Sequence, residues 1–68
     1  MSVQSVVIKK SKMTRDQAIT WIKKHAYTMH YGIDETDNYY RFRQFPPDPK
    51  YNYSTKPLDG LGYLIVVH

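Results

Sequence analysis

The side chains best suited to binding lie between residues 39 and 56, where tyrosines stand close to basic residues. Tyr39, Arg41 and Arg43 are spaced two residues apart, so on a β-strand all three project from one face. Tyrosine and arginine are enriched at protein interfaces, and the same two residue types stack on bases and neutralise phosphates. The candidate binding residues are therefore Tyr39, Arg41, Arg43, Lys50, Tyr51, Tyr53 and Lys56.

Other residue types offer less support for chemistry. The three histidines, His25, His30 and His68, are scattered, and without cysteine they lack the spacing of a zinc site. The acids between residues 34 and 37 can supply an acid–base pair, but turn-forming and strand-capping acids are the simpler interpretation. No Gly-rich phosphate loop or Ser-His-Asp spacing is present. We expect no enzyme activity, no catalytic residue, no metal site and no cofactor.

Charge is distributed unevenly along the chain. Residues 1–33 contain six basic residues and one acid, a net charge of 6 − 1 = +5, whereas residues 34–68 contain four basic residues and five acids, a net charge of 4 − 5 = −1. A basic half favours an anionic partner, although small domains also carry charge for solubility. Because no segment has the length of a membrane span or the apolar region of a signal peptide, we expect an intracellular protein that is neither secreted nor bound to membranes.

A helix is predicted to begin after residue 13. Thr14 and Gln17 match the capping box, in which the two side chains satisfy free backbone N–H groups of the first turn. From Thr14 to about Ala26 the apolar residues recur with a helical period, and Trp21 lies on the apolar face. We interpret Trp21 as an anchor of this helix on a sheet, with ligand stacking as the alternative.

Three strands are predicted, at Val3–Ile8, Asn38–Phe45 and Gly62–His68, because these segments are rich in β-branched and aromatic residues. Four prolines follow the second strand, and together with the Asp59-Gly60 turn they predict a Pro/Tyr-rich loop over residues 46–60.

These elements predict a single α+β domain over residues 1–68. The economical arrangement is one helix packed on a three-stranded, mainly antiparallel sheet, in the chain order strand, helix, strand, strand. A domain of this size has a small core. The predicted core comprises Val6, Ile8, Ala18, Trp21, Ile22, Tyr40, Phe42, Leu64 and Val66.

Three segments carry a distinctive combination of residues: Trp21 to His25 (WIKKH), Asp34 to Gln44 (DETDNYYRFRQ) and Leu58 to Val67. Together they resemble a short domain in proteins of tailed phages and other large DNA viruses, which sometimes lies near a prohead-protease-like region. That domain has the form W-x-K-x-H-G, D-E-T-E-N-Y-Y-R-F-R-Q and a closing G-I-x-x-V. The resemblance spans about Val3 to Val67, and its central eleven residues are the specific part.

The sequence departs from the viral pattern at three points. Ala26 stands where the pattern has Gly, Asp37 stands where it has Glu, and the 68 residues include no protease domain. No catalytic role is therefore carried over. The resemblance implies a viral or proviral origin, a location in the host cytoplasm or the virion, and an accessory or assembly context.

Three functional hypotheses follow from these observations. The first is a non-enzymatic, virus-derived interaction module of the capsid or head, or an assembly accessory protein, that binds a protein partner or another copy of itself. The second is a single-stranded nucleic-acid-binding protein that uses the same basic-aromatic strand face, with an affinity that falls steeply with salt. The third is a small viral effector that inhibits a host factor or sequesters an anionic ligand.

Overall fold

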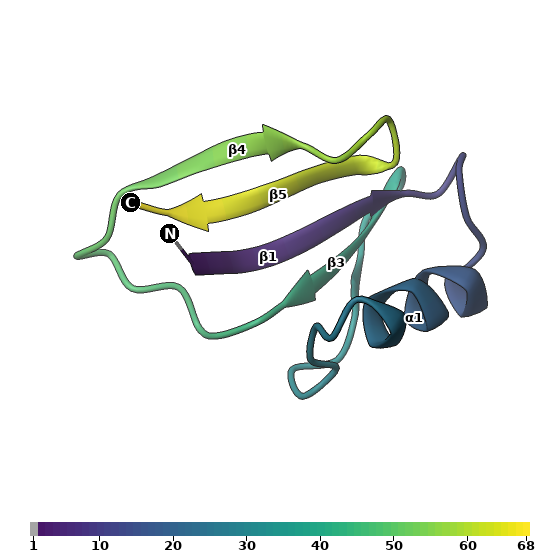
Figure 1. The fold of residues 1–68 in the computed structure, drawn as a ribbon, viewed down its shortest axis with the longest axis horizontal. Coiled ribbons are helices and arrows are strands. Elements are labelled where there is room, and N and C mark those ends of the chain that lie inside the picture. Colours follow the sequence, from purple (N-terminus) through teal and green to yellow (C-terminus); the bar gives the residue numbers. More distant parts are fainter. Residues whose placement is uncertain (1) are drawn as a thin grey trace.

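The computed structural model describes residues 2–68, and within this range it contains one helix and five strands. Figure 1 labels the helix α1 and the strands β1, β3, β4 and β5. All strand pairs are antiparallel, and the strands lie side by side in the order β2-β3-β1-β5-β4. The first strand of the chain is thus the centre of the sheet. The elements are β1 (Ser2–Lys9), α1 (Arg15–Lys24), β2 (Asp34–Glu35), β3 (Tyr39–Arg43), β4 (Tyr53–Pro57) and β5 (Gly62–Val67).

The prediction of a three-stranded sheet is wrong, because the sheet has two further strands, β2 at one edge and β4 at the other. β4 lies inside the segment predicted to be a loop. The carbonyl of Asn52 and the N–H of Leu58 both face β5, so by the alternation of a strand Tyr53, Thr55 and Pro57 direct their backbone groups outward. Pro57 therefore occupies an edge position where the N–H that it lacks would point away from the sheet, and proline is tolerated there.

The second missed strand, β2, is only two residues long. Asp34 is paired with Arg41 and Glu35 with Tyr40. Thr36 closes the hairpin: its N–H donates to the carbonyl of Tyr39 at 2.9 Å, and its hydroxyl accepts from the N–H of Tyr39 at 3.1 Å. Two residues are too few to show the alternation that reveals a strand.

The helix begins where its capping box predicts. The hydroxyl of Thr14 accepts a hydrogen bond from the N–H of Gln17 at 3.3 Å, and the side-chain oxygen of Gln17 accepts one from the N–H of Thr14 at 2.9 Å. The helix ends at Lys24, about two residues before the predicted end. Ala26 has a φ of 61° and so cannot continue a right-handed helix.

The core lies between α1 and one face of the sheet. Ala18 and Ile22 of the helix pack against a buried group on β1 and β3 that includes Val6 and Phe42. Figure 1 shows that α1 lies beside β1 and β3, whereas β4 forms the distant edge. Seven of the nine predicted core residues are buried, and the other two, Trp21 and Leu64, are partly buried at the margin of this cluster. The ring of Trp21 stacks on His25, with 3.9 Å between the ring centroids.

Two polar residues of β1, Gln4 and Ser5, are buried although the sequence does not mark them as core. The register with β5 shifts between Val3 and Ser5, leaving Gln4 without a paired residue on β5. Gln4 is 1% exposed, and its amide donates to the carbonyl of Phe45 at 2.8 Å. The hydroxyl of Ser5 donates to the side-chain oxygen of Gln4 at 2.6 Å. Both buried polar groups are thereby satisfied, as burial requires.

Candidate binding face of the sheet

The sheet has one face that α1 does not cover, which we call the open face. Val6 and Ile8 of the central strand belong to the core, so the residues between and beside them point the other way. Residues paired across neighbouring strands share a face. The register therefore assigns these residues to the open face: Ser5, Val7 and Lys9 of β1; Asp34 of β2; Tyr39, Arg41 and Arg43 of β3; Tyr53, Thr55 and Pro57 of β4; Tyr63, Ile65 and Val67 of β5.

The centre of the open face is packed although no helix covers it. Ser5 is 0% exposed and Val7 is 3% exposed. Long side chains from the neighbouring strands supply the cover: Nε of Arg41 donates to the hydroxyl of Ser5 at 3.4 Å. The rings of Tyr39 and Tyr63 meet edge to face across β1, with centroids 5.7 Å apart. This cover means that arginine and tyrosine side chains form the accessible surface.

The structure brings together three of the predicted binding residues and separates the others. Tyr39, Arg41 and Arg43 lie next to one another on β3, with the side chain of Arg43 3.4 Å from a carboxylate oxygen of Asp34. The Nε atom of Arg43 is buried and makes no aligned hydrogen bond within the described residues. The attraction to Asp34 is therefore the main compensation for burying this charged group.

The remaining predicted residues lie on β4 and in the segment that precedes it. Tyr53 is on the open face, but its hydroxyl is bonded to the backbone of Asp48, accepting from the N–H at 2.6 Å and donating to the carbonyl at 2.8 Å. Lys56 is paired with Leu64 and so faces the helix side. Lys50 and Tyr51 lie in the connection from β3 to β4. Tyr53 thus holds the connection in place, and Lys56 does not contribute to the open face.

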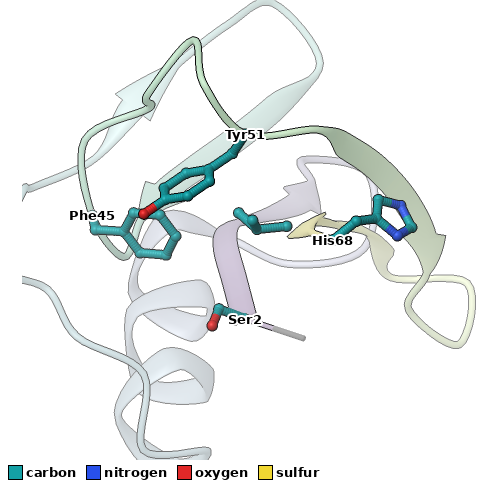
Figure 2. Close-up of a pocket in the computed structure, with 5 residues that line it drawn as sticks. Ser2, Phe45, Tyr51 and His68 are labelled. Atoms are coloured by element: carbon teal, nitrogen blue, oxygen red, sulfur yellow. The ribbon is translucent and has the colours of Figure 1, made fainter.

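A shallow pocket of about 480 Å³ lies at one end of the sheet, where β1 and β5 meet the connection from β3 to β4. Figure 2 shows Phe45 and Tyr51 on one side of this pocket and His68 on the other. Tyr51 is 50% exposed. The pocket is lined by Ser2, Phe45, Tyr51, Val67 and His68. It continues the open face at Val67, so Tyr51 belongs to the margin of the same surface.

A second pocket, of about 250 Å³, lies at the opposite end of β1. Its residues come from the end of β1, the turn that follows it and the start of β3. They are Lys9, Lys10, Ser11, Asn38 and Tyr39. Sequence reasoning missed this pocket, because its two halves come from distant segments and only the β1–β3 pairing brings them together.

Glu35 of β2 forms ion pairs with two basic residues. Glu35 accepts from Lys10 at 3.4 Å and from Arg15 at 3.1 Å, which ties β2 to both ends of the β1–α1 turn.

Within residues 2–68, no group of three His, Cys, Asp or Glu side chains is placed to hold a metal ion. The helix described in the structure is neither long nor apolar enough to cross a membrane.

Comparisons with protein-family models, with curated proteins and with solved structures find no match to this chain. The resemblance to the viral domain therefore stays a prediction from the sequence.

Proposed function

We propose that the protein is a non-enzymatic interaction module that binds a protein partner on its open face. The observation that carries this proposal is the composition of that face. It presents tyrosine, arginine and aliphatic side chains, and its one acid, Asp34, lies on the edge strand β2. The interiors of protein interfaces are likewise enriched in tyrosine and arginine and depleted of acids.

The charges of the open face indicate what the partner must present. Lys9, Arg41 and Arg43 occupy the half formed by β1 and β3, whereas β5 contributes the aliphatic Ile65 and Val67. Complementary potentials across an interface favour encounter and suppress wrong partners. The proposed partner therefore presents an apolar patch with acidic side chains along one side of it.

A protein partner fits the face better than single-stranded nucleic acid. The rings of Tyr39 and Tyr63 contact each other edge to face, which is less suited to base stacking than two separate flat rings. Arg43 is already close to Asp34, and the β4–β5 half of the face has no basic residue. A strand of nucleic acid would need cations along its whole path.

The viral context of this module rests on the sequence resemblance alone. We propose a capsid, head or assembly accessory role within that context, in the host cytoplasm or the virion. The partner on this face can be a different protein or a second copy of the same chain. Sedimentation equilibrium of the isolated protein distinguishes self-association from binding to a different protein.

Selection from a displayed peptide library, followed by calorimetry, tests the proposal. Peptides selected on the immobilised protein should combine acidic with apolar residues. Arg41→Ala should weaken their binding about tenfold, the effect of losing roughly 1.4 kcal/mol at an interface anchor. Lys23→Ala is the matched control, because it removes the same charge from the exposed surface of α1.

Two outcomes would contradict the proposal. One is a set of peptides whose affinity is the same for Arg41→Ala and for wild type. The other is tight binding of a labelled oligonucleotide at low salt that decreases steeply at high salt, which would support the nucleic-acid alternative. Circular dichroism of each variant shows whether it is folded.

A further inference from the structure

The pocket between β1 and β3 combines features that suit an oxyanion. The five residues that line it are two lysines, a serine, an asparagine and a tyrosine, all of which carry hydrogen-bond donors, and none of them is an aspartate or a glutamate. Two backbone hydrogen bonds shape the pocket. The N–H of Lys10 donates to the carbonyl of Asn38 at 2.9 Å, and the N–H of Lys12 donates to the carbonyl of Lys9 at 3.0 Å.

The two lysines of the pocket differ in their partners. The ammonium group of Lys10 lies 3.4 Å from Glu35 and 5.4 Å from the centre of the Tyr40 ring, which restricts its position. Among the described residues, Lys9 has no carboxylate within ion-pair distance. Glu35 is shared with Arg15, so its single negative charge is balanced by two cations. The pocket therefore keeps an excess of positive charge.

Partial burial distinguishes these lysines from those on the helix. Lys9 and Lys10 are both partly buried, whereas Lys23 and Lys24 are exposed at the end of α1. A partly buried side chain has already lost some of its conformational freedom, so binding a ligand costs it less entropy. The pocket is thus better organised for binding than the more exposed basic surface.

We propose that this pocket binds a phosphate group. Phosphate is a compact anion with several acceptor oxygens, and lysine binds it as a point charge. A volume of about 250 Å³ leaves room for the group and for part of the molecule that carries it. The proposal goes beyond the proposed function: the two surfaces share Lys9 and Tyr39, but phosphate binding is measured without a protein partner, so either proposal can fail while the other stands.

Titration of the ¹⁵N-labelled chain with inorganic phosphate tests the proposal, with sodium chloride adjusted to hold the ionic strength constant. The amide signals of Lys9, Lys10, Ser11, Asn38 and Tyr39 should shift and saturate together. A second titration with O-phosphoserine identifies the source of the group. Tighter binding of O-phosphoserine indicates a phosphomonoester on a larger molecule, and equal binding indicates recognition of the phosphate alone.

Two matched variants make the result decisive. Lys9→Gln should weaken phosphate binding about tenfold, because it removes the ammonium group that has no carboxylate partner. Lys23→Gln, which removes the same charge from α1, should leave the affinity unchanged. The proposal is overturned if no saturation is observed, or if both variants weaken binding equally, as diffuse attraction to a basic protein would require. The same spectra report whether each variant is folded.

Discussion

At Gly62 the backbone of β5 lies very close to the backbone of β1. Gly62 is paired with Ile8 of the central strand and has a φ of +156°. A Cβ atom built on Gly62 would overlap the carbonyl oxygen of Val7 and lie 2.9 Å from its carbonyl carbon. Because both obstacles are backbone atoms, they cannot be relieved by a rotamer change. Gly62→Ala must therefore push the two strands apart or shift their register.

The cost of this substitution can be estimated from its two parts. Forcing extra atoms into a packed contact costs about 1–3 kcal/mol, and placing an L side chain at an unfavourable φ costs about 1–3 kcal/mol more. A domain of this size has a net stability of about 3–5 kcal/mol. Gly62→Ala should thus remove most of the free energy of unfolding and leave a large fraction of the chain unfolded at 25 °C.

Urea denaturation followed by Trp21 fluorescence measures this loss, with Gly60→Ala as the control. Gly60 also has a positive φ, +79°, but a Cβ built on it meets no atom within 4 Å. Gly60→Ala should therefore cost only the conformational penalty of about 1 kcal/mol for an L residue at a positive φ. If Gly62→Ala were no more destabilised than Gly60→Ala, the close approach of β5 to β1 would be refuted.

Two further predictions concern the helix and its ion pairs. Thr14→Ala should lower the free energy of unfolding by about 1 kcal/mol through loss of the cap, and Thr14→Asp should restore most of that loss. Thermal unfolding followed by circular dichroism checks both variants. An alanine variant as stable as the wild type would argue against the cap. Glu35→Gln removes the exposed ion pairs with Lys10 and Arg15 and should cost less than about 1 kcal/mol. Because salt screens exposed pairs, the difference should shrink in 1 M NaCl, and a difference that persists there would point to another role for Glu35.

Local signals in the sequence predict those parts of the fold that depend on residues close to one another along the chain. The capping box locates the start of α1, since its geometry involves only residues 14–17. Alternation places Tyr39, Arg41 and Arg43 on one face of β3, because the side-chain period of a strand is two residues. These predictions need no knowledge of what lies beside the element.

The parts that were missed depend on contacts between distant segments. Proline indicates that residue 57 is not inside a sheet, but whether it lies in a loop or on an edge depends on whether β5 has a free side. Lys56 is among the predicted binding residues, although its pairing with Leu64 places it on the other face. The phosphate pocket requires Asn38 to lie beside Lys10, and a spacing of 28 residues carries no local signal.

The open face exists because one short helix cannot cover both sides of a five-stranded sheet. A ten-residue helix is about 15 Å long, and it packs on one face only. On the other face, Arg41 and its neighbours bury Ser5 and Val7 in place of a second layer. The same side chains therefore stabilise the sheet and form the proposed binding surface. Arg41→Ala should affect both properties, whereas Arg41→Lys keeps the charge and much of the stem, so comparing the two variants separates the packing role of Arg41 from the role of its charge in binding.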